Sequence, residues 1–595
     1  MLESLRQIGE LYRDKPSILS EPIRRNFKKE PVILQIIFDL DNNKVYYQDR
    51  KYQPKLVEDY MWIGHTFSAT RERIARLTFT DRKYFPEVIT NLINRLPNNE
   101  ETKDLIDILT EIKLNLIDRD TTLQTDLTSY VENMEGYEVV FYTICAKRDG
   151  KTIELAKQNT YAKAIQYLIS PASSRTKGIC HVCGKEKEVY TDPAFESGTM
   201  LKMYIVDQPG YLAGVSSKKN KSSLLRTYSI CPDCRYSLII GEKKITRDFK
   251  LKIGDLRVNV LPKTGLLRET SEEDLDKILQ EFRSVSEGLG VIAKLEENLE
   301  EGWITDDWYS LTLIFGERRQ ADFDYLGMIE EVPITQITNI RTNIMKISKD
   351  AMDIWTNDDQ KTWYLTLDTI VKMIPLRVFS EKVEFFPLID LLTALLKNHQ
   401  YPYRRLIRFA LTSACAHRFE SYQGLKIHKE KSPDLSLVMG MLKFNYLMLL
   451  MQEMGLMSQN VPETYELNVE EEVQKWIKQM RYDSWKTALF LMGYLIGKIG
   501  NAQYNKEDKR KSILDKIDFK GMKWDRILRL VGEIMNSLRN YRILEYNEGV
   551  YHEMCKLIDQ SRALIEKNDP EENLFYILTG YSFATYGSIR RGQNQ

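Results

Sequence analysis

Two pairs of cysteines constrain this chain more than any other feature, because each pair has the spacing of a metal-binding turn. Cys180 and Cys183 form the first C-x2-C, and Cys231 and Cys234 form the second after a spacer of 47 residues. Two residues between the thiolates allow a tight turn to direct both sulfur atoms at one ion, and Gly184 suits the left-handed backbone that such a turn can need. The sequence therefore predicts one structural Zn²⁺ held by four thiolates in a closed tetrahedral site.

Other interpretations of the cysteines are four unrelated buried thiols, a redox pair or an iron–sulfur cluster. A spacer this long departs from compact zinc fingers, so we expect it to hold its own strand and loop. A closed site leaves no open coordination position, so the ion is expected to stabilise rather than catalyse. We expect His181 to face solvent. Three basic residues are close enough in sequence to offset part of the negative charge of the site: Lys185, Lys187 and Arg235.

The distribution of charge is more informative than its total. Lys+Arg and Asp+Glu both number 85 in 595 residues, so the net charge predicts no partner. Residues 141–270 contain 23 basic and 12 acidic side chains, whereas residues 271–340 contain 5 basic and 17 acidic ones. A basic segment is thus followed by an acidic one, which we expect to be solvated; a basic protein partner is the alternative.

The sequence predicts a cytoplasmic protein with no membrane partner. The first 15 residues lack the apolar core of a signal peptide. The longest apolar run, 488–497, is too short to cross a bilayer, and polar residues interrupt 437–457. In the cytoplasm, the seven cysteines favour metal binding or packing over disulfides.

The predicted fold class is α+β and multidomain, with an inserted four-cysteine zinc module and an all-α helical bundle at the C-terminus. Hairpins are predicted at 31–49, turning at 41–43, and at 138–157, turning at Asp149-Gly150. Helices are predicted over 70–134 and from about 385 onward, and strands at 251–261 and 308–315. The predicted domains are an α/β domain (1–175), the zinc module (176–245), a continuation of the α/β part with an acidic helical insert (246–384) and a helical domain (385–595).

Three groups of basic residues are candidate nucleic-acid contacts. One lies in a low-complexity loop at 216–223 and just after it, one interleaves with aromatic residues at 401–408, and one lies on a predicted helix near 524–538. Each group has an ordinary alternative, which is a solvated surface or a helix face whose arginines pair with carboxylates. The candidates are Lys218, Lys219, Lys221, Arg226, Arg404, Arg405, Arg408, Lys523 and Arg526.

Two further patterns predict how the C-terminal helices pack. Gly493 and Gly497 have a spacing that permits close approach of two helices in a bundle. One helix face is predicted to be apolar and buried, and it contains Trp524, Ile527, Leu528, Val531, Ile534, Met535 and Leu538.

The sequence predicts no catalytic residues. It contains no P-loop, no His-Asp dipeptide and no H-E-x-x-H. The six histidines are scattered, although His417 and His428 could meet a carboxylate in space. A nuclease with a spatially assembled site and a scaffold that binds only proteins remain alternatives to a nucleic-acid-binding subunit.

Four sequence blocks, together with the cysteine pairs, resemble the large subunit of the type I-B CRISPR interference complex (Cascade). The blocks are LKMYIVDQPG (201–210), LTLIF (311–315) followed by IEEVP (329–333), ALFLMGYLIGKI (488–499) and ENLFYILTGY (572–581). The combination is more specific than the cysteine pairs alone and brackets most of the chain.

The resemblance implies a non-catalytic subunit that helps recognise the protospacer-adjacent motif, binds target DNA and recruits a separate helicase–nuclease. Its implied partners are the guide RNA, the target DNA, the backbone and handle-binding CRISPR-associated subunits, a small subunit related to its own C-terminal region, and the helicase–nuclease. The last part of the chain, about 480–595, resembles the small subunit of related complexes. In this family that part can be made separately by internal translation, for which Met480 is a plausible start.

Overall fold

The structure is a computed structural model in which the chain divides into two compact units. Unit 1 is Met1–Lys250 with Glu317–Tyr325, and unit 2 is Leu251–Gly316 with Leu326–Gln595. The four predicted domains are finer than this division, and their boundaries stay predictions. The structure describes residues 1–23, 26–63, 75–170, 175–190, 195, 199–201, 229–263, 273, 310–318, 323–356, 358, 360–458, 466–506 and 511–593.

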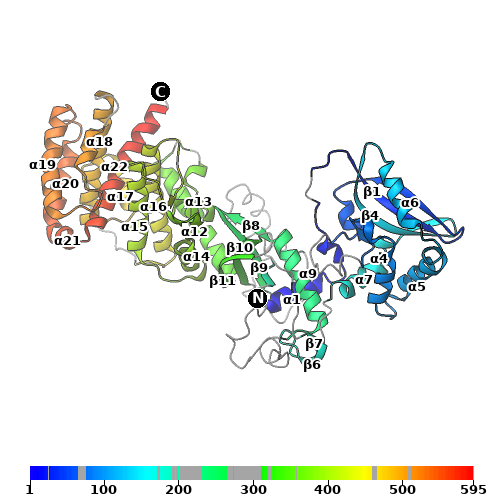
Figure 1. Ribbon diagram of the computed structural model, residues 1–595. Helices are drawn as coiled ribbons and strands as arrows, with labels where there is room; N and C mark the ends of the chain where they lie inside the picture. The colour runs from blue at the N-terminus through cyan, green and yellow to red at the C-terminus, as the bar shows by residue number, and fades with distance from the viewer. Residues whose placement is uncertain are drawn as a thin grey trace. The chain divides into compact units, whose positions relative to one another are not determined.

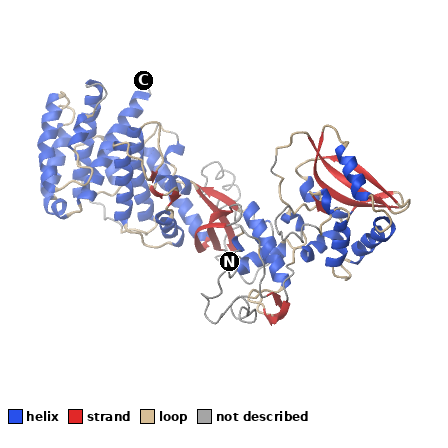
Figure 2. Ribbon diagram, in the orientation of Figure 1, coloured by secondary structure: helices blue, strands red, loops and turns tan. Residues whose placement is uncertain are grey.

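Unit 1 combines a mixed sheet with surrounding helices (Figure 2). Its strands are β1 (Glu30–Asp39), β2 (Lys44–Lys51), β3 (Thr78–Phe79), β4 (Tyr137–Arg148), β5 (Lys151–Glu154), β6 (Arg175–Ile179) and β7 (Glu186–Tyr190). Its described α-helices are α1 (Leu2–Leu11), α2 (Leu56–Asp59), α4 (Glu87–Arg95), α5 (Lys103–Ile112), α6 (Leu123–Glu132), α7 (Asn159–Leu168) and α9 (Pro232–Asp248), with a 3-10 turn at Pro16–Leu19 and a π-helical turn at Lys113–Ile117.

The central sheet has the order β2-β1-β4-β3, and β5 pairs with β4. Both predicted hairpins are present. β1 runs antiparallel to β2 and parallel to β4, so the tips of the two hairpins meet at one edge. There, both oxygens of Asp41 accept 3.0 Å hydrogen bonds from the backbone of Asp149 and Gly150. The two donor residues, Asp149 and Gly150, have positive φ angles of 52° and 69°, as a tight hairpin turn requires.

Helices α1 and α9 of unit 1 cross at two glycines. A Cβ atom on Gly9 would lie 1.7 Å from the backbone oxygen of Ser237, and one on Gly241 would lie 2.0 Å from that of Leu5. Only glycine permits backbones to approach so closely. The N-terminal helix is therefore fitted directly onto the helix that begins with the second cysteine pair.

Unit 2 begins with a small sheet and continues as helices. It contains all or most of the strands β8 (Lys250–Ile253), β9 (Leu256–Lys263), β10 (Ser310–Arg318), β11 (Phe323–Pro333), β12 (Leu376–Phe379), β13 (Lys382–Val383) and β14 (Leu425–Lys426). Its helices are α12 (Ile334–Ile354), α13 (Leu367–Met373), α14 (Phe386–Lys397), α15 (Tyr403–Arg418), α16 (Pro433–Glu453), α17 (Glu471–Gln479), α18 (Ser484–Lys506), α19 (Trp524–Asn540), α20 (Glu548–Gln560), α21 (Arg562–Lys567) and α22 (Pro570–Gln593).

The strands predicted at 251–261 and 308–315 belong to the sheet β11-β10-β9-β8, in which β11 was not predicted. The region predicted as one strand at 251–261 is instead the hairpin β8–β9, because Gly254 takes a left-handed φ of 59° and reverses the chain. The helical C-terminal region is confirmed, and with it the α+β fold class.

An aromatic cluster forms the core of the helical part. Trp355 stacks on Trp363 with ring centroids 5.3 Å apart, and Trp476 lies against Trp355 and Phe583. The indole N–H of Trp355 donates to the hydroxyl of Tyr446 at 3.2 Å, so this buried polar group is satisfied. The cluster joins α12, α16, α17 and α22.

Helices α18 and α22 lie side by side (Figure 1), and glycines on both determine their approach. A Cβ on Gly493 would lie 1.8 Å from the backbone oxygen of Ile577, and one on Gly580 would lie 1.9 Å from that of Phe490. A Cβ on Gly497 would lie 2.7 Å from the Cβ atom of Ala584. The predicted close helix approach is confirmed, and Gly580 is the partner that the sequence pattern did not identify.

Two helices of unit 2 bear on earlier expectations. Within the described residues, α16 alone is long and apolar enough to cross a membrane, and 78% of its most apolar window is buried inside the protein. Helix α19 is amphipathic as predicted, but Leu528 is 47% exposed and the buried residues are Ile527, Leu530, Ile534 and Leu538. The prediction for Leu528 is wrong because its position falls one residue outside the core-facing stripe.

Candidate metal centre

The first cysteine pair lies in the turn between β6 and β7. The backbone N–H of Gly184 donates to the carbonyl of Cys180 at 2.8 Å, and the N–H of Cys180 donates to the carbonyl of Lys185 at 3.0 Å. Gly184 has a φ of 69°, so the left-handed glycine predicted after Cys183 is present. These contacts fold the segment into a knuckle that directs both thiols to one side.

The second cysteine pair lies at the start of α9. Cys231 is the N-cap residue, Pro232 begins the helix, and Cys234 lies in its first turn. A two-way backbone bridge joins Tyr190, at the end of β7, to Ile230, with the Tyr190 N–H donating at 2.9 Å. The bridge brings the second knuckle beside the first in spite of the long spacer between them.

The ligand atoms of Cys180, Cys183, Cys231 and Cys234 all lie within 4.8 Å of one another. Tetrahedral Zn–S bonds of about 2.3 Å would place the sulfurs about 3.8 Å apart, so the cluster fits one metal ion. Three of the four side chains are buried, and Cys183 is partly exposed. In the part of the chain that the structure describes, no other group of three or more histidine, cysteine or acidic side chains is arranged in this way.

Hydrogen bonds around the sulfurs favour a cluster that carries negative charge. The backbone N–H of Cys231 donates to the Sγ of Cys180 at 3.3 Å. Hydrogen bonds with Cys231 and then Cys234 lower the pKa of the Cys180 thiol, whereas hydrogen bonds with Cys180 and then Cys231 raise the pKa of the Cys234 thiol. One thiolate shared among neighbouring thiols is the arrangement from which a cation displaces protons.

His181 is exposed and is held by Ser229 rather than by the cysteine cluster. Its Nδ1 accepts a hydrogen bond from the backbone N–H of Ser229 at 2.9 Å and lies 3.0 Å from the hydroxyl of the same residue. The imidazole therefore ties the first knuckle to the residues that precede the second.

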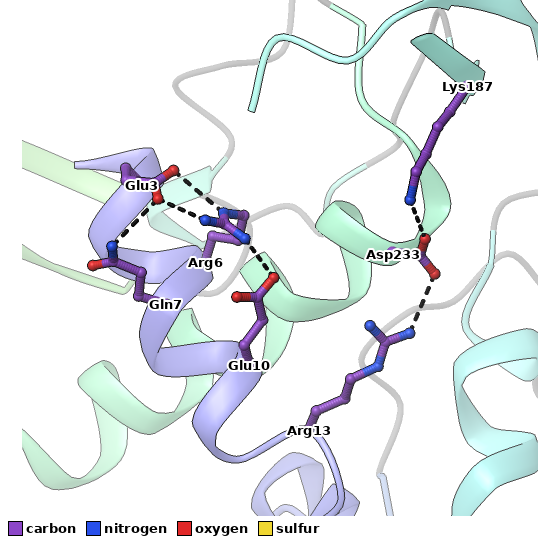
Figure 3. A network of polar contacts seen from close by, with 7 residues as sticks. All are labelled: Glu3, Arg6, Gln7, Glu10, Arg13, Lys187 and Asp233. Carbon is purple, nitrogen blue, oxygen red and sulfur yellow. Dashed lines mark hydrogen bonds and ion pairs between the residues drawn. The ribbon is translucent and has the colours of Figure 1, made fainter. Parts of the chain in front are cut away.

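Asp233, which lies between Cys231 and Cys234 in the sequence, contacts two basic residues near the cluster. Figure 3 shows its contacts with Lys187 and Arg13. One oxygen of Asp233 accepts from Lys187 on β7 at 3.0 Å, and the other accepts from Arg13, after α1, at 3.2 Å. Asp233, and then the cysteine sulfurs, raise the pKa of Lys187. Of the three cations expected to offset the negative charge of the site, Lys187 is the one bound beside it.

Arg235 serves a different purpose from the one expected. It is 3% exposed, and its guanidinium donates to the carbonyl of Ile169 at 2.9 Å, which ties α9 to the end of α7. Arg13 and Asp233 were missed by sequence reasoning. The signal in the sequence was Asp233 itself, an acidic residue in the first turn of the helix that presents Cys231 and Cys234. A carboxylate at that position also interacts favourably with the helix dipole.

The three arginines of the segment 401–408 lie on α15, and each meets a carboxylate. Arg404 lies 3.9 Å from Asp569, Arg408 lies 3.1 Å from Glu571, and Arg405 pairs with Asp390. All three side chains are more than half exposed. The ion pairs are those of the alternative interpretation, and a nucleic-acid contact at these residues stays a prediction.

The remaining candidate contacts fall into two sets. Lys523 is the exposed N-cap of α19, and no partner for it is found within the described residues; Arg526 pairs with Asp518 at 2.7 Å. The other set lies outside the described residues and comprises Lys218, Lys219, Lys221 and Arg226. Most of the acidic stretch 271–340 also lies outside them.

Comparison with protein families places all three parts of the chain in one family. Residues 1–166 match the N-terminal domain of CRISPR-associated protein TM1802 (cas_TM1802), residues 177–332 match its central domain, and residues 365–595 match its C-terminal domain. All four clustered cysteines lie in the part that matches the central domain. No curated protein matches the chain. Three successive matches in family order cover most of the sequence, and the chain therefore belongs to the CRISPR-associated TM1802 (cas_TM1802) family.

Proposed function

We propose that this protein is the non-catalytic large subunit of a type I-B CRISPR RNA-guided surveillance complex. In this role it helps to recognise the protospacer-adjacent motif, binds target DNA and recruits a separate helicase–nuclease in the cytoplasm. The observation that carries the proposal is the ordered match to all three domains of one CRISPR-associated family. Guide pairing supplies sequence specificity in such complexes, so the protein needs duplex and strand contacts rather than a catalytic centre.

The metal in this proposal is a single structural Zn²⁺. Four thiolates in one cluster are the ligand set that zinc takes in closed structural sites. When bound, the ion supplies the positive charge that holds four thiolates together. The residues of this chain do the rest: the β6–β7 turn and the start of α9 present the ligands, and Lys187 balances part of the charge.

The nucleic-acid contacts proposed for unit 2 are exposed cations on α15 and at the start of α19. Lys523 has no partner within the described residues and can meet a phosphate at little cost. The arginines of α15 must instead exchange a carboxylate for a phosphate. Because their ion pairs are more than half exposed on the arginine side, that exchange costs little.

Co-purification tests the function directly. The tagged chain, expressed with its genomic neighbours, is expected to bring down CRISPR-associated backbone subunits and a short guide RNA, and the complex is expected to bind duplex DNA that carries the matching target. Binding should weaken steeply with salt, and Lys523→Gln together with Arg408→Gln should reduce the salt slope. A chain that recovers neither guide RNA nor other CRISPR-associated subunits would contradict the proposal.

The same preparation separates the alternatives. Metal-dependent cleavage of DNA or RNA by the isolated chain, abolished by one point substitution, would identify a nuclease. A complex that contains protein partners but no crosslinkable nucleic acid on this subunit would identify a scaffold that binds only proteins.

A further inference from the structure

Unit 2 contains a cavity of about 220 Å³ that the nucleic-acid function does not use. It lies among α13, α15, α16 and the segment that follows β14. Its volume is below that of a typical drug-sized site and suits one small group. The polar residues that the argument uses are Asp368, Ser413, His417, His428, Glu430 and Lys443.

Lys443 brings an ammonium group into this cavity without a hydrogen-bond acceptor. Its side chain is only 16% exposed, and its one ion pair is with Glu430, at 4.0 Å, beyond hydrogen-bond distance. Within the described residues no other partner is found for it. Burial lowers the pKa of Lys443, with Glu430 opposing that effect. A buried cation with unused donors is costly unless an acceptor reaches it.

Two further donors face the same space. His417 is 2% exposed, and its Nδ1 lies 3.3 Å from the hydroxyl of Tyr422. Burial lowers the pKa of His417 to about 4, so the ring is neutral at pH 7. We assign the Tyr422 hydroxyl as the donor to Nδ1, which is the tautomer that leaves the ring proton on Nε2, and no partner for Nε2 is found within the described residues. The hydroxyl of Ser413, on the same helix and 6% exposed, has none there either.

Each of the two carboxylates of the cavity lies beside a basic side chain. Asp368 accepts from the backbone N–H of Gly254 at 2.8 Å and pairs with Lys372 at 2.5 Å. The carboxylate of Glu430 lies 3.6 Å from His428 and 4.0 Å from Lys443, and no hydrogen bond to it is found within the described residues. The donors on Lys443, His417 and Ser413 therefore stay available to a ligand that brings acceptor oxygens.

We propose that this cavity binds a phosphate group, which accepts hydrogen bonds from Lys443, His417 and Ser413. These donors come from two helices and are a cation, a neutral imidazole and a hydroxyl, so they suit a ligand with several acceptor oxygens about one centre. The phosphate is carried by a small molecule, either free or as part of a mononucleotide. The proposal does not depend on the role of the chain in a surveillance complex.

Calorimetric titration of the full chain tests it with three probes. Inorganic phosphate and adenosine 5′-monophosphate are expected to bind, and adenosine, which lacks the phosphate, is not. Similar affinities for the first two would show that phosphate alone is recognised, whereas tighter binding of the nucleotide would show that the base and sugar contribute. No binding of either phosphate-bearing probe would overturn the proposal.

Lys443→Met distinguishes a binding lysine from a structural one. Loss of a charged donor is expected to weaken phosphate binding roughly 10-fold to 100-fold. The midpoint of thermal unfolding without ligand is expected to stay the same or to rise, because the substitution removes a buried charge that no hydrogen bond compensates. Lys346→Met is the control, since that lysine pairs on the surface with Glu453 at 3.0 Å.

Ser413→Ala and His417→Phe provide independent tests if Lys443→Met fails to fold. Each removes one donor, and each is expected to weaken binding of inorganic phosphate severalfold. If the folded Ser413→Ala and His417→Phe proteins bound inorganic phosphate as tightly as the wild type, the cavity would not be the binding site.

Discussion

The carboxylate of Asp233 lies 3.0 Å from the ammonium of Lys187, Oδ2 to Nζ, and this pair joins the turn of the second cysteine pair to the strand that follows the first. Arg13 binds the other oxygen of Asp233. Asp233 thus links β7, α9 and the residues that follow α1 through two ion pairs (Figure 3).

Lys187→Met is expected to make the protein lose zinc faster. The substitution removes the cation nearest the thiolates, and partners outside the ligand set commonly tune metal affinity. Because the pair is partly exposed, we expect an effect of roughly 2-fold to 10-fold on the rate of zinc transfer to a chelator. Lys185→Met is the control, since Lys185 is exposed on the same turn without a resolved charge contact. Equal rates for the two variants would refute the role of Lys187.

Removal of the metal is expected to open the knuckles of unit 1 without unfolding unit 2. Purified protein should contain about one zinc per chain, and Cys231→Ser should lose it because a serine hydroxyl is a poor zinc ligand. Limited proteolysis should then cut between β6 and α9 in Cys231→Ser but not in the wild type. Cys555→Ser, which changes a thiol in α20 outside the cluster, should retain the metal. A metal-free wild-type protein with the same cleavage pattern would contradict the zinc assignment.

Gly493→Ala is expected to destabilise unit 2 by about 3 kcal/mol or more, because the new Cβ would lie 1.8 Å from a backbone oxygen of α22 and the helices must separate. Gly532→Ala is the matched control. Gly532 is also helical, in α19, but a Cβ there meets no atom within 4 Å. That substitution is expected to stabilise the protein by about 0.5–1 kcal/mol. Thermal unfolding of both variants measures the contrast, and equal effects would show that the crossing tolerates a wider spacing.

The stability of the protein is expected to fall between pH 7 and pH 5 in part through His417. Burial is the main cause that lowers its pKa from 6.5 to about 4, and the nearby positive charges of Lys429 and His428 add to it. Below pH 6.5 the unfolded chain binds a proton that the folded chain does not, so acid favours unfolding. The effect is about 2 kcal/mol at pH 5.

His417→Gln removes this proton uptake and should flatten the pH dependence of thermal unfolding over the same range. The comparison is made as a difference between the two proteins, because carboxylates elsewhere titrate in the same interval. A variant that loses as much stability as the wild type between pH 7 and pH 5 would show that His417 is protonated in the folded state.

Sequence patterns predicted features that depend on neighbours in the chain. The hairpin turn at Asp149-Gly150, the knuckle at Gly184 and the helical spacing of Gly493 and Gly497 are local, and each is present. The convergence of the cysteines was also predictable, because four ligands in two C-x2-C pairs have few other uses.

Features that depend on distant residues were not predictable. The carboxylates that pair with Arg404 and Arg408 are more than 160 residues away, so the sequence could not decide between an ion pair and a free cation. The cavity around Lys443 is assembled from three helices and a loop. Although His417 and His428 were noted, nothing local indicated the buried ammonium beside them.

The packing of α22 has a consequence for any shorter product of this sequence. A polypeptide that began at Met480 would retain α18, α20 and the glycine crossing, but it would lack α15, α16 and the buried indole of Trp476. The side of α22 that those helices cover would then face water, including the Thr579 hydroxyl that accepts from Asn445 at 3.0 Å. Such a fragment would expose one face of α22 to solvent. Its solubility would depend on a partner protein that covers this face as α16 does in the full chain.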